Sequence, residues 1–205
     1  MYSLVRAGVK SVRCGLPGGK LGIRQDKSNA GLPDKGYVHV YTGDGKGKTT
    51  AALGVAYRAA GWGLKTFIGQ FMKGVDYGEY LYALDQDDKI TIRRYGEDSM
   101  IHPDEVRDED CKRADNGLND IKSVIESGQY DIVILDEINV ACAYGLIPVS
   151  EIVQLIESKP AGVELILTGR DAPDEFLQRA DLISEMREVR HYYQKGILSR
   201  KGIDR

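Results

Sequence analysis

A glycine-rich run at residues 42–50, Thr-Gly-Asp-Gly-Lys-Gly-Lys-Thr-Thr, constrains the fold of this chain more than any other feature. It follows the β-rich run Tyr37–Thr42 and precedes Lys48–Ala60, which is rich in helix formers and is followed by Gly61 as a stop signal. Glycines let the backbone turn several N–H groups toward one anion, and a helix N-terminus adds partial positive charge. A strand, a glycine loop and a helix in this order predict a loop that binds phosphate groups.

The polar side chains of this loop suit a nucleoside triphosphate and its metal. Lys48 can reach two phosphates, Thr49 can offer its hydroxyl to Mg²⁺ (or Mn²⁺), and Lys46 adds a second cation. The usual pattern places a glycine six residues before the lysine, where this sequence has Thr42 and the glycine comes one residue later. The alternative, a glycine turn that binds nothing, is disfavoured because strand, loop and helix agree. We expect MgATP to be bound by Gly43, Asp44, Gly45, Lys46, Gly47, Lys48, Thr49 and Thr50.

Strand-like and helix-like segments alternate along the rest of the chain. This alternation predicts an α/β fold like that of P-loop NTPases, a mostly parallel twisted sheet of about six strands with helices on both faces. Further strands are expected at Lys65–Phe71, Ile90–Tyr95, Asp131–Leu135, Val163–Thr168 and Leu182–Val189. Further helices are expected at Tyr77–Leu84, Asp104–Ser127, Pro148–Ser158 and Asp174–Ala180, and an extended tail after His191.

Positive charge is concentrated at the start of the chain. Residues 1–35 hold seven Lys or Arg and two acidic residues, a net charge of +5, whereas the whole chain carries −3. This stretch is rich in glycine and lacks sustained periodicity, so we expect a flexible arm at 1–35 and a single domain at 36–205. The arm has no continuous apolar segment typical of a secretory signal, and a transit peptide is the less favoured alternative.

Composition argues against several classes of protein. No apolar run approaches the roughly 20 residues of a membrane span, and the net charge of −3 gives no case for binding nucleic acid. The three cysteines are far apart and form no C-x-x-C pair, which fits a reducing compartment. We therefore expect a cytoplasmic protein without membrane or nucleic-acid partners.

Two acidic residues, Asp136 and Glu137, follow the apolar run Asp131–Leu135. The carboxyl ends of parallel strands lie at the edge of the sheet where ligands bind, beside the phosphate loop. Carboxylates there hold Mg²⁺ directly or through its waters. The sequence does not separate the two residues, and an acid after a strand can also be a solvated helix cap.

Beyond the loop, the chain resembles the P-loop class of ATP:corrinoid adenosyltransferases from about Tyr37 onward. The resemblance includes the displaced first glycine of the loop. The resemblance rests on these short sequence motifs: TGDGKGKTTAALG (42–54), Arg58-Ala59, GQFMKG (69–74), Gly78-Glu79, DIVILDEIN (131–139), Ala143-Tyr144, LTGRDAP (167–173), ADLISEMREVRH (180–191) and GID (202–204).

This resemblance implies that the Co(I) centre of a reduced corrinoid attacks the 5′ carbon of ATP and that triphosphate leaves. The corrinoid is a substrate, and no protein nucleophile is needed. The resemblance implies that Thr49, together with Glu137 or Asp136, binds the metal. It also implies that Lys48, Thr49 and Glu137 are the catalytic residues. Further ATP contacts are expected from Arg58, Gln70, Lys73 and Arg170, with ordinary surface charge as the alternative for the three cations. A homodimer and a flavoprotein electron donor are also implied.

The sequence departs from this family after the third strand. Well-known members carry a Phe and a Trp near the corrinoid, but residues 95–102 read Tyr-Gly-Glu-Asp-Ser-Met-Ile-His. Either Tyr95, Met100 or Ile101 fills the apolar role, with Met100 and Ile101 favoured, or the corrinoid sits differently. Tyr144 is either a corrinoid contact or a packed aromatic. The competing functions are an ordinary P-loop kinase or ATPase and a non-catalytic nucleotide- or corrinoid-binding module.

Overall fold

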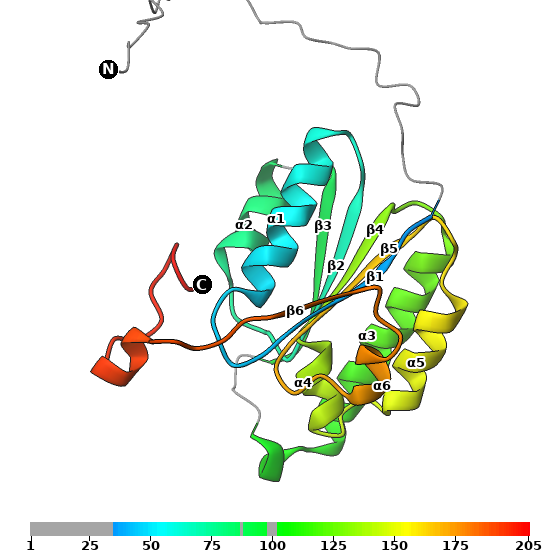
Figure 1. The fold of residues 1–205 in the computed structure, drawn as a ribbon. Helices are drawn as coiled ribbons and strands as arrows, with labels where there is room; N and C mark the ends of the chain where they lie inside the picture. Colours follow the sequence, from blue (N-terminus) through cyan, green and yellow to red (C-terminus); the bar gives the residue numbers. More distant parts are fainter. Residues whose placement is uncertain (1–34, 87, 98–101) are drawn as a thin grey trace, which may run out of the picture. The chain divides into compact units, whose positions relative to one another are not determined.

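Six parallel strands form one sheet in the order β3-β2-β4-β5-β1-β6 (Figure 1). The computed structural model describes residues 35–86, 88–97 and 102–205. The predicted α/β fold with about six strands is confirmed. The strands are β1 (Val38–Thr42), β2 (Thr66–Phe71), β3 (Ile90–Tyr95), β4 (Ile132–Asp136), β5 (Glu164–Thr168) and β6 (Leu182–Glu185).

Helices cover both faces of this sheet (Figure 1). One face carries α1 (Lys48–Gly61) and α2 (Gly78–Gln86). The other carries α3 (Asp108–Glu126), α4 (Ile138–Ala143), α5 (Val149–Ser158) and α6 (Asp174–Leu177). Two short 3₁₀ helices are η1 (Pro103–Glu105) and η2 (Tyr192–Lys195). In the part of the chain that the structure describes, no helix combines the length and apolar character that a membrane crossing needs.

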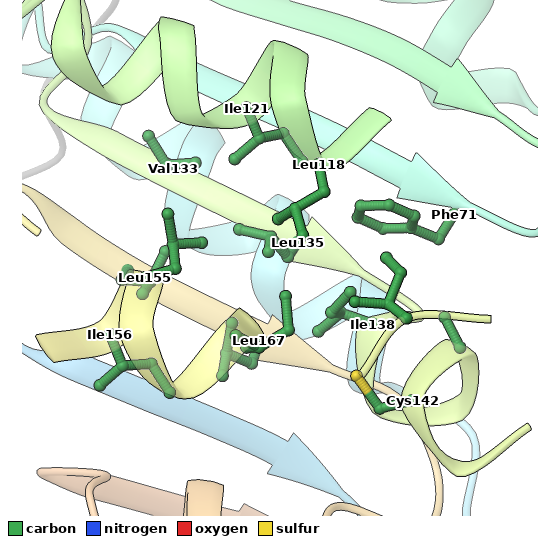
Figure 2. Packing of buried hydrophobic residues seen from close by; sticks show 14 of the residues in the cluster. Phe71, Leu118, Ile121, Val133, Leu135, Ile138, Cys142, Leu155, Ile156 and Leu167 are labelled. Atoms are coloured by element: carbon green, nitrogen blue, oxygen red, sulfur yellow. The ribbon is translucent and has the colours of Figure 1, made fainter. Parts of the chain in front are cut away.

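The apolar strand β4 serves two cores at once, because successive side chains of a strand point to opposite faces. Val133 and Leu135 point toward α3 and α5, where they pack with a cluster that includes Leu118 (Figure 2). Ile132 and Ile134 point to the opposite face and pack with the apolar side of α1. All five residues of β4 are buried. This explains why the run is continuous rather than alternating.

Two glycines let α3 approach the sheet closely. A Cβ atom on Gly117 of α3 would lie 2.4 Å from Cγ of Tyr95, and one on Gly69 of β2 would lie 2.6 Å from Cδ1 of Ile121. The ring of Tyr95 therefore fills a notch above Gly117, and its hydroxyl donates a hydrogen bond to Asp120 on the same helix. This packing fixes the end of β3.

Several predicted boundaries were wrong for local reasons. The helix expected at Asp104–Ser127 begins at Asp108 after a separate 3₁₀ turn, because the Asp110 carboxylate accepts the Arg107 N–H at 3.1 Å and caps the helix there. The strand expected at Leu182–Val189 ends at Glu185, and the helix expected at Asp174–Ala180 ends at Leu177. The tail expected to be extended contains η2, and helix α4 was not predicted.

Candidate functional site

The phosphate loop, residues 43–47, joins the carboxyl end of β1 to the first turn of α1. Gly43 has φ 92°, a left-handed value that favours glycine, and a Cβ atom there would lie 2.5 Å from the carbonyl oxygen of Met186. The N–H of Gly45 donates to that same carbonyl at 2.6 Å. The chain just after β6 therefore contacts the loop from one side. Strand β6 ends at Glu185, whose partner Thr42 is the last residue of β1.

Lys48 lies folded back over this loop. Its Nζ donates to the carbonyl oxygens of Gly43 at 2.6 Å and Gly45 at 2.8 Å. The residue is only 8% exposed, and this burial lowers the pKa of its ammonium group, an effect opposed by the charge of Glu137. The ammonium is thus held in place by the loop itself, at the helix terminus where an anion is favoured.

Asp136, the last residue of β4, is the centre of a buried polar network. It is 1% exposed, and its Oδ1 accepts hydrogen bonds from the hydroxyls of Thr49 at 2.8 Å and Thr168 at 2.7 Å. Its Oδ2 accepts from Lys73 Nζ at 2.6 Å and from Gln70 Nε2 at 3.2 Å. Burial opposes ionisation, but the charge of Lys73 together with the hydrogen bonds from Lys73, Thr168 and Thr49 outweighs it, so the pKa of Asp136 lies below its usual range.

Lys73 forms an ion pair with Asp136 at the carboxyl end of β4. Its Nζ also lies 3.4 Å from the Thr49 hydroxyl, and the charges of Asp136 and Glu137 raise the pKa of its ammonium group against the effect of burial. Gln70 is fully buried beside it and donates to Glu79 Oε1 at 3.2 Å as well as to Asp136. The predicted residues Gln70 and Lys73 are therefore assembled around Asp136.

Glu137 differs from its neighbour in both backbone and surroundings. Its φ of 63° is left-handed, and its N–H donates to the Thr168 hydroxyl at 3.1 Å. Burial, with the charge of Asp136 added, raises the pKa of its carboxyl group, while Lys73, Lys48 and Arg170 oppose the rise. Arg170 is exposed on the surface and is not among the described residues that line the cavity, and its charge lowers the pKa values of Glu137 and Lys48.

A cavity of about 390 Å³ opens between the phosphate loop and α2. Four parts of the chain line it: the loop with the first half of α1, the residues before and at the start of α2, the residue after β4, and a segment near residue 203. They are Lys46, Gly47, Lys48, Thr49, Thr50 and Leu53, then Lys73, Tyr77, Gly78 and Glu79, then Glu137, and finally Gly202, Ile203, Asp204 and Arg205.

The donor set fits a hard divalent cation that completes its shell with phosphate and water oxygens. The Thr49 hydroxyl and the Asp136 carboxylate are 2.8 Å apart, and Glu137 lines the same cavity. Mg²⁺ prefers one or two carboxylates together with substrate phosphates. Among the described residues, no cluster of three or more His, Cys, Asp or Glu could hold a metal alone.

Other residues predicted for the site lie elsewhere. Arg58 is exposed ten residues after Lys48, roughly 15 Å along α1, and is not among the described residues that line the cavity. Its charge acts on Tyr41, and its expected contact with ATP stays a prediction. Tyr95 is committed to packing on α3, as described above, and Tyr144 packs against the core as a partly buried residue. Met100 and Ile101 lie outside the described residues.

Three features of the site had no role assigned from the sequence. Thr168 connects Asp136 to the backbone of Glu137. Glu79 lines the cavity and binds Gln70, and Asp204 pairs with Lys46 at 2.9 Å. Each lies within a sequence motif already noted (LTGRDAP, Gly78-Glu79 and GID), but only the fold shows that these motifs lie close together.

Comparisons with known proteins agree on one family. The sequence pattern described as ATP:corrinoid adenosyltransferase BtuR/CobO/CobP matches residues 34–204. A corrinoid adenosyltransferase of Escherichia coli is 33% identical over 172 residues, 83% of this chain and 86% of that protein. Corrinoid adenosyltransferase CobA of Salmonella typhimurium is 31% identical over the same shares of both chains. An uncharacterized protein of Nostoc sp. is 40% identical over 169 residues, 76% of this chain but only 45% of that longer protein.

Proposed function

The chain belongs to the BtuR/CobO/CobP family of ATP:corrinoid adenosyltransferases, and we propose that it transfers the 5′-deoxyadenosyl group of ATP to the Co(I) centre of a corrinoid. Triphosphate is the second product, and the reaction serves the synthesis or salvage of adenosylcobalamin. The observation that carries the proposal is the phosphate loop, whose Lys48 and Thr49 meet the Asp136 network at one cavity.

The reaction is a displacement at carbon. The electron pair of Co(I) forms a bond to C5′ of the ribose, the bond from C5′ to the phosphate oxygen breaks, and its electron pair leaves with the triphosphate. The substrate cobalt is the nucleophile, so the protein has to stabilise a polyanion as it departs. Fixed cations and backbone N–H groups are the groups that stabilise developing negative charge most effectively.

We assign that task to the phosphate loop together with the start of α1, residues 43–50. Lys48 is held by two loop carbonyls, Lys46 lines the cavity, and the N-terminus of α1 adds its partial positive charge. Thr49, Asp136 and Glu137 are the residues that would hold Mg²⁺, which neutralises phosphate charge when it is bound. Because Lys73 contacts both Asp136 and Thr49, we place it as the cation that holds this acidic centre together.

For the corrinoid, the chain offers fewer described residues. Tyr144 remains a proposed contact, and Met100 and Ile101 remain the proposed apolar residues beside the cobalt. Because Tyr95 packs on Gly117 of α3, we favour Met100 and Ile101 over Tyr95 for this apolar role. A homodimer, a flavoprotein electron donor, a cytoplasmic location and the division into an arm (1–35) and one catalytic domain (36–205) are also proposed.

The test is anaerobic incubation of the protein with MgATP and a chemically reduced corrinoid, followed by the visible spectrum. We expect the spectrum of Co(I) to be replaced by that of an adenosyl corrinoid. Lys48→Ala should abolish this change, whereas Lys112→Ala, an exposed lysine of α3, should not alter it. Release of ADP and phosphate with no cobalt–carbon product would instead indicate a kinase or ATPase.

A further inference from the structure

The segment Arg200–Arg205 reaches the phosphate loop from the far end of the chain. Four of its residues, Gly202, Ile203, Asp204 and Arg205, line the same cavity as Lys46 and Lys48. The contact is polar: Lys46 Nζ lies 2.9 Å from Asp204 Oδ1 and donates to the Ile203 carbonyl oxygen at 3.3 Å. Two residues 158 positions apart in sequence therefore meet at the rim of the site.

Asp204 is held firmly within its own segment. Its side chain is only 9% exposed, because Oδ2 accepts hydrogen bonds from the N–H and Nε of Arg200, each at 3.0 Å, and Oδ1 accepts from the Tyr192 hydroxyl. The N–H of Asp204 also donates to the Arg200 carbonyl at 2.9 Å, which closes the turn. The carboxylate is a fixed point, and hydrogen bonds from Tyr192, Lys46 and Arg200 keep its pKa well below the usual range.

Lys46, in contrast, would be mobile without this partner. Its side chain is 40% exposed and comes from a glycine-rich loop. A free lysine side chain has considerable rotamer entropy, so a lysine that is already ordered binds an anion more tightly than a free one. An ammonium has three donors, and Asp204 with Ile203 accepts two of them, which leaves one for a ligand in the cavity.

The net charge of the cluster indicates that Asp204 positions Lys46 rather than competing with the ligand for it. A carboxylate beside a phosphate site repels the ligand unless it is neutralised. Here Lys46 and Arg200 both face Asp204, so the cluster of three side chains carries a net charge of +1. The cluster thus keeps an attractive potential at the rim while it fixes the direction of one ammonium group.

We propose that Asp204 is a positioning residue that holds Lys46 in place for the polyphosphate chain of the nucleotide. This deepens the proposed function and rests on it only in taking the loop as a polyphosphate site. The effect acts through Lys46, so it should vanish when Lys46 is removed. Because the pair is partly exposed, we expect its effect on affinity to be modest, roughly three- to fivefold.

The test is a double-mutant cycle on the full chain, with inorganic tripolyphosphate as the probe and calorimetry as the measurement. We expect Asp204→Asn to weaken binding roughly three- to fivefold and to have no further effect in the Lys46→Ala background. Asp204→Glu should retain most of the affinity, and Tyr192→Phe should weaken binding less than Asp204→Asn does. Glu126→Gln, an exposed acid on α3, is the matched control and should bind like the wild type.

Three results would overturn the inference. Tighter tripolyphosphate binding by Asp204→Asn would show that Asp204 competes with the ligand. An equal loss in the presence and absence of Lys46 would show that Asp204 acts by another route. A change in melting temperature that accounts for the whole loss would indicate a structural role alone. The spectral assay of the proposed function does not depend on these outcomes, whereas a wild-type protein that bound no tripolyphosphate would refute the loop assignment itself.

Discussion

Replacing Asp136 by alanine tests the network at the centre of the site. The substitution leaves the ammonium of Lys73, whose side chain is 11% exposed, without its main partner and removes the acceptor for Thr49 and Thr168. Removing one partner of a buried ion pair costs about 3–5 kcal/mol. Lys73 reaches some solvent, so we expect the lower end, about 3 kcal/mol.

The assay is equilibrium urea unfolding followed by circular dichroism. With an m-value of about 2 kcal/mol per M, a loss of 3 kcal/mol lowers the midpoint by about 1.5 M. The double variant Asp136→Ala/Lys73→Met should recover about 1 kcal/mol, because the unpaired charge is gone while the two hydroxyls still lack an acceptor, at about 1 kcal/mol each. Asp104→Ala, an exposed residue of η1, should leave the midpoint unchanged. A loss below about 1 kcal/mol for Asp136→Ala, or no recovery in the double variant, would refute this reasoning.

Three other predictions follow from packing and burial. Gly117→Ala should destabilise the fold by about 1–3 kcal/mol, measured by urea unfolding, because its Cβ atom would lie 2.4 Å from the Tyr95 ring; a neutral result would contradict the close contact. Burial raises the pKa of the Cys142 thiol to about 12, so about one molecule in ten thousand carries the thiolate at pH 8, and mass spectrometry should find this residue unalkylated in the native protein. Hydrogen bonds from Arg107 hold the pKa of Asp110 below its unfolded value of about 3.9, so this carboxylate stabilises the fold above that pH and loses its effect as the pH falls below it. Asp110→Asn should therefore lose less stability than the wild type between pH 5 and pH 3, and parallel losses would count against the assignment.

The sheet could be predicted from the sequence because its signals are local and strong. The run at residues 132–135 is apolar on both faces, and the glycine loop sits between a β-rich run and helix formers. Helix α4 was missed because six residues without a cap signal give too little periodicity to detect. The start of α3 was misplaced because the side chain of Asp110, rather than the residue at the boundary, decides where the helix begins.

The site was predictable only in part, for a similar reason. Asp136 and Glu137 were predicted because they follow an apolar run at the edge where parallel strands present ligands, whereas Gln70 and Lys73 were expected from the family resemblance. The sequence could not separate Asp136 from Glu137, and the fold does, since Asp136 alone takes the Thr49 hydroxyl. The pairing of Lys46 with Asp204 depends on how a long tail folds back, which no local pattern encodes.

The central claim is that ATP is used at its ribose end. The most direct measurement is a single-turnover reaction with ATP labelled at C5′, reduced corrinoid and the wild-type protein under anaerobic conditions. We predict that the labelled carbon is found bonded to cobalt and that one tripolyphosphate is released for each bond formed. Label that remains in ADP, with inorganic phosphate as the only other product, would contradict the account.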